Sequence, residues 1–409
     1  MIKLQPLSKI LLTILAFCAV TVSAQTFTTL ANFNGTNGAH PDSSLVQGSG
    51  GSFYGTASTG GLHSSGTIFK MSPAGKVTVL YNFCSLTDCN DGAGPGTLLV
   101  ASDGNAYGIT STGGANCHDL VNIGCGTIFK LTPQKKLITL YSFCAQTNCT
   151  DGWTPNSLIQ ATDGNFYGTA FTSGPNGFGE VFKITPGGVF TVLYGFCPQG
   201  GSCTDGGLPE NLMQAANGNF YGTTYEGGTN NTDCGVVFEL APNGTLTTLH
   251  SFDANDGCYL HSGLIQGTDG NFYGTTQDGG APHSRGTVYQ LTSSGTLTRL
   301  HSFCTETSCS DGELPGAALV QGSDGNLYGT TRGVVGGGRT NDGTIFEITP
   351  GGELTTLHQF AYTDGAWPVA ALIQAANGDF YGTTLYGGFA KCTQSCGTVF
   401  SLSLGLGPR

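Results

Sequence analysis

Charged residues are scarce in this chain of 409 residues, and basic residues are the scarcer kind. Only 10% of the residues are charged, 14 of them are Lys or Arg, and the formal net charge is −12. Nucleic-acid binding needs clustered Lys and Arg to neutralise phosphates, and no such cluster exists here. The composition therefore excludes a nucleic-acid partner.

Long apolar runs are missing after the first 24 residues, which excludes a transmembrane segment in the rest of the chain. Within those residues, Lys3 and Lys9 precede an apolar stretch over 10–22 and small residues ending at Ala24, a pattern typical of a secretory signal peptide. We expect residues 1–24 to be removed and residues 25–409 to be secreted, either outside the cell or into the bacterial cell envelope. A lipoprotein anchor at Cys18 is the weaker alternative, because the bulky Phe17 precedes it.

Sequence motifs of enzymes are also missing. We find no Gly-x-Ser-x-Gly nucleophile between a strand and a helix, no phosphate loop and no dinucleotide fingerprint in a suitable context. No run of the Asp-x-Asp-x-Asp type indicates a calcium loop. The sequence therefore predicts no catalytic residue, no cofactor and no metal.

Cysteine is present in an even number once the leader is set aside, since 14 of the 15 cysteines follow residue 24. That number suits disulfides in an oxidising compartment, and the short spacings suit staples within loops better than a zinc site. Cys234 and Cys258 are left for each other after the close pairs are formed, and this match is the least determined. The expected pairs are Cys84 with Cys89, Cys117 with Cys125, Cys144 with Cys149, Cys197 with Cys203, Cys234 with Cys258, Cys304 with Cys309, and Cys392 with Cys396.

A tandem repeat is the most informative feature of the sequence. Five copies of Phe-Tyr-Gly-Thr and two looser copies contain tyrosines at Tyr54, Tyr107, Tyr167, Tyr221, Tyr273, Tyr328 and Tyr381. Their spacings of 53, 60, 54, 52, 55 and 53 residues fit the four-stranded blade of a β-propeller. The 67 glycines recur at fixed positions in these copies, which indicates turns.

The two ends of the chain indicate how the repeats close. Residues 27–33 resemble the fourth strand of a copy, whereas the last copy stops after its third strand at 397–402. We therefore predict an all-β fold, a single seven-bladed β-propeller of four-stranded blades over residues 25–409, in which the N-terminal strand completes the last blade. An open stack of repeats is the alternative, and it would leave a strand unpaired.

The repeat also resembles a known family. Gly-Asn-Phe-Tyr-Gly-Thr-Thr occurs at 218–224 and 270–276, and other segments are similar to Gly-Thr-Val-Phe and Leu-Tyr-Ser-Phe. These motifs resemble the tandem GloVer (Gloeo/Verruco) repeats of bacteria, over essentially all of residues 25–409. The resemblance implies a secreted bacterial β-propeller, and it brings no established activity.

Acidic and histidine residues recur at fixed places in the copies. An acidic ring that binds cations or hydroxyl-rich ligands is one interpretation of the repeated Asp-Gly pairs, but a turn required in every blade explains the repetition better. His250, His301 and His358 replace Tyr81, Tyr141 and Tyr194 of other copies, which favours a packing role. Loop histidines such as His261 can reach a ligand, although solvated loop histidines are commoner. The Asp-Gly pairs between copies begin at Asp91, Asp151, Asp205, Asp256, Asp311 and Asp364.

Residues that depart from the repeat are better candidates for function, because a site needs a unique constellation whereas the fold needs a recurring one. Exposed aromatic side chains beside amide and carboxylate groups suit sugar binding, and packing over a turn is the equally weighted alternative for the tryptophans. The candidate ligand-binding residues are Trp153, Trp367, Tyr225, Glu226, Asp278, Glu313, Arg332 and Tyr386.

Two functions remain open from the sequence. The first is a noncatalytic extracellular propeller that binds carbohydrate or protein, or that serves an envelope or matrix role, as a monomer. The second is a carbohydrate-active hydrolase or lyase, for which Glu226, Glu313 and Asp278 are the available carboxylates.

Overall fold

Seven four-stranded antiparallel sheets make up the computed structural model of this protein, which describes residues 25–116, 125–200, 203–229, 232–306, 308–336, 339–388 and 396–407. The first four blades run from the inner to the outer strand as β2 (Val46–Gln47), β3 (Phe53–Ala57), β4 (Thr67–Met71) and β5 (Val77–Asn82); β6 (Ala93–Val100), β7 (Ala106–Thr112), β8 (Thr127–Leu131) and β9 (Leu137–Ser142); β10 (Trp153–Gln160), β11 (Phe166–Thr172), β12 (Glu180–Ile184) and β13 (Phe190–Gly195); and β14 (Gly207–Gln214), β15 (Phe220–Glu226), β16 (Val236–Leu240) and β17 (Leu246–Ser251). The last three are β18 (Ile265–Gln266), β19 (Phe272–Thr276), β20 (Thr287–Leu291) and β21 (Leu297–Ser302); β22 (Val320–Gln321), β23 (Leu327–Thr331), β26 (Thr344–Ile348) and β27 (Leu354–Gln359); and β28 (Ile373–Gln374), β29 (Phe380–Thr384), β30 (Thr398–Ser403) and β1 (Thr26–Asn32).

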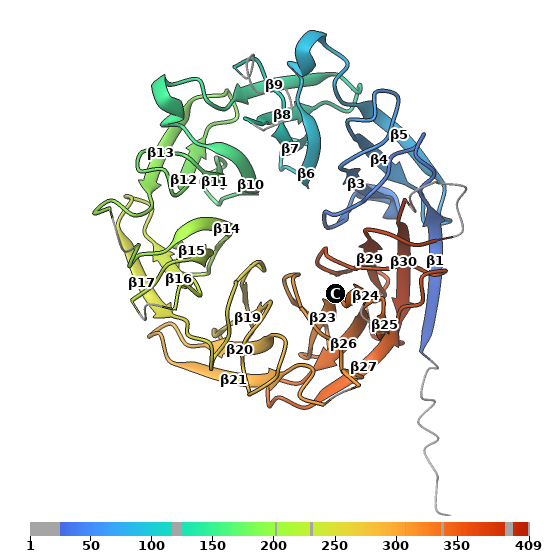
Figure 1. Ribbon diagram of the computed structural model, residues 1–409. Coiled ribbons are helices and arrows are strands. Elements are labelled where there is room, and N and C mark those ends of the chain that lie inside the picture. The colour runs from blue at the N-terminus through green and yellow to red at the C-terminus, as the bar shows by residue number, and fades with distance from the viewer. Residues whose placement is uncertain are drawn as a thin grey trace, which may run out of the picture.

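The sheets form a ring, so the fold is a seven-bladed β-propeller (Figure 1). The predicted closure is confirmed: β1 pairs antiparallel with β30, with Thr26 opposite Ser403 and Asn32 opposite Thr398. Inside the seventh blade a strand from the start of the chain is thus hydrogen-bonded to a strand from its end. This pairing covers the edge of β30 that would otherwise be open.

The Phe-Tyr pair of the repeat joins neighbouring blades. Tyr107 of the second blade packs on Phe166 of the third, with ring centroids 4.2 Å apart, and Tyr381 of the seventh packs on Phe53 of the first at the same distance. The Tyr107 ring is buried while its hydroxyl donates to Asp103 in a turn at 2.8 Å. Five of the seven blade interfaces contain such an aromatic pair, and Ala106 and Leu327 replace the phenylalanine in the other two.

The Asp-Gly pairs between blades serve as turns, as the repetition predicted. Asp91 is buried and accepts hydrogen bonds from the Tyr81 hydroxyl at 2.8 Å and from the backbone N–H of Ser85 at 2.9 Å. The histidines take the place of the tyrosines: His250 Nε2 lies 2.7 Å from Asp256 and His301 Nε2 lies 2.9 Å from Asp311. These carboxylates hold the blade connections and are not free to form an acidic ring.

Disulfides staple several of the same connections. The structure joins Cys84 to Cys89, Cys144 to Cys149, Cys197 to Cys203, Cys234 to Cys258 and Cys304 to Cys309. Cys125 and Cys396 are also disulfide-bonded, and their expected partners, Cys117 and Cys392, lie outside the described residues. The Cys234–Cys258 bond spans 24 residues and ties the segment just before β16 of the fourth blade to the connection that enters the fifth.

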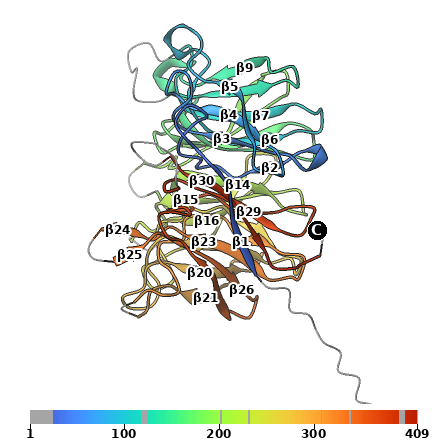
Figure 2. The same cartoon turned by 90° about the vertical axis from the view of Figure 1, so that its right-hand side faces the viewer.

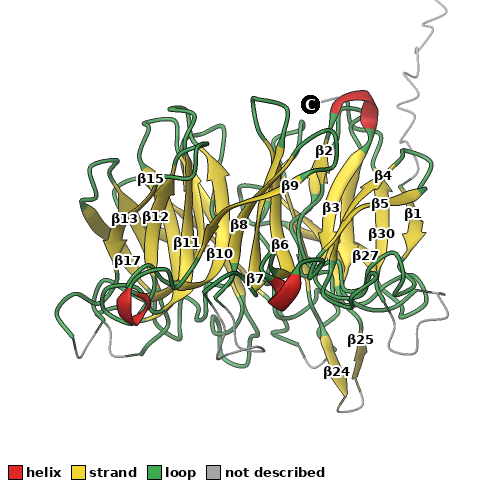
Figure 3. Ribbon diagram, turned by 90° about the horizontal axis from the view of Figure 1, so that it is seen from above, coloured by secondary structure: helices red, strands yellow, loops and turns green. Residues whose placement is uncertain are grey.

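The disc has two unlike faces. We call the loop face the one that carries the connections between second and third strands and between blades; a two-stranded hairpin, β24 (Val334–Gly336) with β25 (Arg339–Asn341), projects from it. Figures 2 and 3 show this hairpin on the face opposite the described C-terminal end. The described part of the chain contains no helix with the length and hydropathy needed to cross a bilayer.

Candidate functional site

A cavity of about 460 Å³ lies where the inner strands of the blades meet. All seven blades contribute equivalent positions to its wall. These positions lie at or just after the proline near the start of each inner strand, or after Leu260 in the copy that lacks this proline. The constant part of the repeat gives the cavity its shape. The residue after the proline varies from blade to blade, so the lining is chemically asymmetric.

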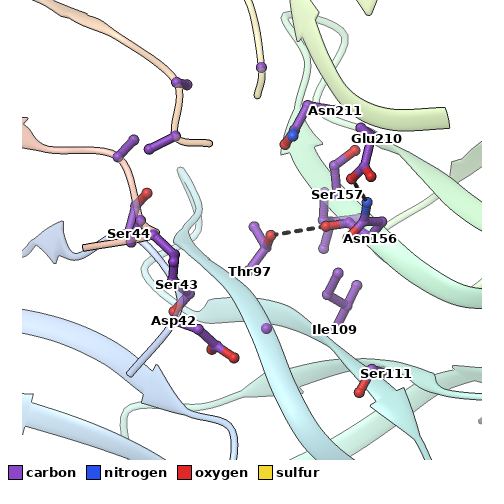
Figure 4. A pocket seen from close by; sticks show the side chains of 18 of the residues that line it. Asp42, Ser43, Ser44, Thr97, Ile109, Ser111, Asn156, Ser157, Glu210 and Asn211 are labelled. Atoms are coloured by element: carbon purple, nitrogen blue, oxygen red, sulfur yellow. Dashed lines mark hydrogen bonds between the residues drawn. The ribbon is translucent and has the colours of Figure 1, made fainter. Parts of the chain in front are cut away.

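One wall of the cavity carries a polar cluster built from three consecutive blades. Glu210 on β14 is only 6% exposed and accepts a hydrogen bond from Asn156 Nδ2 (Figure 4). Its Oε1 lies 2.9 Å from His261 Nδ1. A carboxylate oxygen accepts, so Nδ1 of His261 is the donor in this contact. The cluster thus presents an oriented histidine ring, with a side chain that is 36% exposed.

Asp42 enters the cavity from the first blade, away from Glu210 (Figure 4). Its Oδ1 atom is buried and has no hydrogen-bond partner among the described residues. Burial raises the pKa of the Asp42 carboxyl to about 6, although a hydrogen bond with Ser58 opposes the shift. Two carboxyl groups in unlike environments therefore line the same cavity.

Aromatic side chains rise beside the polar cluster on the loop face. Tyr225, at the end of β15, stacks on Tyr259 with ring centroids 5.0 Å apart and lies 4.6 Å from the His261 ring. Phe171 continues the row 6.5 Å from Tyr225. Burial, with the nearby Tyr259, Glu210 and Glu226, raises the pKa of Tyr225, so its hydroxyl stays protonated. We call Phe171, Tyr225 and Tyr259 the tyrosine rim.

A second rim joins the sixth, seventh and first blades. The Arg332 guanidinium carbon lies 4.8 Å from the centre of the Trp367 ring, Trp367 meets Tyr386 edge-on at 5.2 Å, and Tyr386 meets His40 edge-on at 5.1 Å. We call these four residues the arginine rim. The structure thus brings together three of the residues singled out from the sequence, Arg332, Trp367 and Tyr386, and adds His40.

Trp367 and Tyr259 occupy the same special backbone position, immediately before the proline or its replacement Leu260. Their φ angles are 57° and 61°, and the equivalent residues Thr154 and Gly94, with φ of 52° and 61°, line the cavity. Trp153 lies one residue earlier in its copy, where the side chain takes the other side of the strand. It is half-buried, and its Nε1 is buried without a partner among the described residues.

The three carboxylates expected from the sequence lie outside the cavity lining. Glu313 is 1% exposed, and the nearest cation is Arg285, whose Nε lies 3.5 Å from Oε2. Glu226 stands opposite Gly207 at the end of β15, and burial raises its pKa. Asp278 is exposed and lines a separate cavity of about 630 Å³ near His283.

One group of metal-type ligands occurs in the described part of the chain, formed by Cys304, Cys309 and Glu313. The two cysteines are joined in a disulfide, so they provide no thiolates to a metal. This group is therefore a structural cluster.

Six contributors to the cavity and its rims were not singled out from the sequence: His40, Asp42, Asn156, Phe171, Glu210 and Tyr259. The available signal was the variable residue after the proline of each copy, which reads Asp42, Gly96, Asn156, Glu210, His261, Gly316 and Val369 through the seven blades. His261 follows Leu260 in the copy that lacks the proline, and it was identified only as a loop histidine.

The fold and its lining define the class of protein as a seven-bladed propeller with a polar central cavity and two aromatic rims on the loop face. The Gloeobacter/Verrucomicrobia repeat model matches residues 16–121, 118–334 and 305–407. The chain belongs to this repeat family. No curated protein matches the sequence.

Solved structures share the architecture at low sequence identity. One, described as the extracellular domain of a hybrid two-component system from Bacteroides thetaiotaomicron, matches with a TM-score of 0.56 and 13% identity over 93% of this chain and 41% of that chain. This chain thus spans about two fifths of that protein. Another, a protein of unknown function from Bacteroides thetaiotaomicron VPI-5482, matches with a TM-score of 0.50 and 11% identity over 93% of this chain and 76% of that one. Both show the propeller fold alone.

Proposed function

We propose that this protein is a secreted, noncatalytic propeller that binds a glycan across the cavity mouth on the loop face. The observation that carries the proposal is the convergence of Tyr225, Tyr259 and His261 above the polar pair of Asn156 and Glu210. Sugar rings present apolar faces that stack on aromatic side chains and hydroxyls that exchange hydrogen bonds with amides and carboxylates.

Secretion is part of the proposal. The apolar leader at 1–24 and the loop disulfides both suit a protein exported to an oxidising compartment. N-terminal sequencing of protein collected outside the cytoplasm checks it, and the expected first residue is Gln25.

Glycan binding is tested on an array with the purified chain, followed by titration of any hit. Tyr225→Ala and Tyr259→Ala should each weaken binding by about tenfold or more, because each removes a stacking surface near the centre of the site. Tyr362→Ala is the matched control, since Tyr362 is 50% exposed and lines neither cavity. Capture of a protein with no array signal would point instead to a protein partner.

Acid–base cleavage of a glycan is the second candidate function, and a specific observation favours it. Asp42, Glu210 and His261 are the titratable side chains that line the central cavity, and Glu210 orients the His261 ring. Release of reducing or unsaturated sugar ends from a polysaccharide panel, abolished by Glu210→Gln and by His261→Gln, would support an enzyme. Glu226→Gln is the control, because Glu226 lies outside the cavity lining.

A further inference from the structure

Arg332 has an unusual electrostatic position on the loop face. It follows β23 directly, and its backbone N–H donates to the Leu314 carbonyl at 3.1 Å. Among the described residues it forms no ion pair, and its Nε is buried without a hydrogen-bond partner. A buried guanidinium nitrogen without a partner is costly unless a ligand completes it.

Four other basic residues of the described chain have an acidic or carbonyl partner. Lys130 lies 3.2 Å from Asp103, Lys183 lies 3.1 Å from Asp163, and Arg285 lies 3.5 Å from Glu313. The guanidinium of Arg299 donates to the backbone carbonyl of Asn255. In a protein with a net charge of −12, an unpaired cation beside a cavity mouth is a distinctive feature.

The surroundings of Arg332 fix its orientation. The guanidinium lies over the Trp367 ring at 4.8 Å, and Trp367 is itself held edge-on by Tyr386 at 5.2 Å. Stacking holds the planar fork of an arginine, and that fork matches a carboxylate with two parallel hydrogen bonds. The equivalent residues in the other blades are Ser58, Ser111, Phe171, Tyr225, Gln277 and Leu385, so the cation is present once in the ring.

We propose that Arg332, stacked on Trp367, is the subsite for the carboxylate of an acidic sugar, so that the ligand of the propeller is a glycan containing uronic acid. This inference rests on the proposed glycan-binding function. The arginine rim supplies the charge contact together with the aromatic rings of Trp367 and Tyr386, and the tyrosine rim supplies stacking that is indifferent to charge.

The test compares uronate oligosaccharides with their carboxyl-reduced counterparts, in which the acid becomes an uncharged alcohol. The wild-type chain should bind at least one uronate about tenfold tighter than its reduced counterpart, and added salt should shrink that preference. Arg332→Gln should bring the ratio close to one while leaving affinity for the reduced glycan within about twofold. Arg332→Lys should restore part of the preference, because it keeps the charge and loses the fork.

Several outcomes would overturn the assignment of Arg332 as the carboxylate subsite. A preference that survives Arg332→Gln, or an equal loss for both sugars, would show that Arg332 has only a packing role. Binding of acidic peptides with no uronate binding would identify a protein ligand instead. Arg299→Gln is the control arginine. Tyr225→Ala should weaken both sugars and keep their ratio, so a failure of glycan binding as a whole is distinguishable from a failure of this subsite.

Discussion

The residue before the proline of each inner strand adopts a left-handed conformation that few side chains favour. Its φ is 56° at His40, 56° at Leu208 and 58° at Leu314, as well as positive at Tyr259 and Trp367. Glycine at this place, as in Gly94, avoids the steric cost of about 1 kcal/mol or more per residue. Leu208 and Leu314 belong to neither rim, so this backbone conformation reflects the connection that every blade needs, and the rims use it to present large side chains.

Glu180 is a second residue that the fold tolerates at a cost. Four other blades place a threonine pair here, such as Thr110 and Thr127 with hydroxyls 2.9 Å apart, whereas the third blade sets Ala170 opposite Glu180. Glu180 is fully buried, and neither carboxyl oxygen has a partner among the described residues. Burial, and then the charge of Asp151, raises the pKa of Glu180 to about 9.

This raised pKa makes folding stability fall as pH rises between the unfolded value of 4.5 and about 9, because the unfolded state gives up a proton that the folded state keeps. We expect Glu180→Gln to be more stable than the wild type by about 1 kcal/mol or more at pH 8, with the difference shrinking toward pH 5. Denaturant midpoints at both pH values measure it. Glu353→Gln, at an exposed position, is the control, and a difference independent of pH would refute the argument.

At the scale of elements, the disulfides divide into local staples and one longer tie. Cys84 and Cys89 are 5 residues apart, whereas Cys234 and Cys258 are 24 apart and adjoin the tyrosine rim. Cys258 directly precedes Tyr259, whose backbone N–H donates to the Cys234 carbonyl at 3.2 Å. The longer tie therefore positions a residue of the proposed site.

Removing each disulfide should separate these roles. In the chain-entropy treatment, loss of the short loop costs about 2 kcal/mol of stability and loss of the longer loop about 3.5 kcal/mol. Replacing both Cys234 and Cys258 by Ser should also reduce glycan affinity, because Tyr259 loses its anchor, whereas replacing Cys84 and Cys89 should leave affinity unchanged. Unfolding midpoints and titrations on both variants check this, and equal affinity losses would contradict it.

The sequence was sufficient to predict the elements but only part of the site. Turns are needed in every blade and the Phe-Tyr stack forms five of the seven blade interfaces, so both appear as a repeat. By contrast, Asn156, Glu210 and His261 lie on three consecutive blades and meet only when these blades pack against one another. The difference between Trp153 and Trp367 was also hidden, because a shift of one residue along a strand moves a side chain to the opposite side.

At the scale of the whole molecule, stability depends on a closed ring. The backbone N–H of Ala376 in the seventh blade donates to the side-chain oxygen of Gln47 in the first at 2.9 Å. This contact lies on the face opposite the loop face. Phe27 of β1, in the seventh blade, stacks on His358 of β27 in the sixth blade at 3.7 Å. It also lies 5.5 Å from Phe400 of its own blade. The first strand therefore joins neighbouring blades as well as completing its own sheet.

Removing β1 should open this ring. A chain that lacks residues 25–33 exposes the edge of β30 and the aromatic surface that Phe27 covers, and an open apolar edge pairs with other chains. We expect this variant to form dimers or larger species in light scattering, to unfold at lower temperature, and to be restored by a peptide spanning 25–33 added in trans. Phe27→Ala should cost about 2 kcal/mol because it empties a partly buried aromatic position, whereas Thr28→Ala, at an exposed position of the same strand, should be neutral. A truncated chain that keeps the oligomeric state and melting temperature of the full-length protein would show that the other six blades hold the ring without this strand.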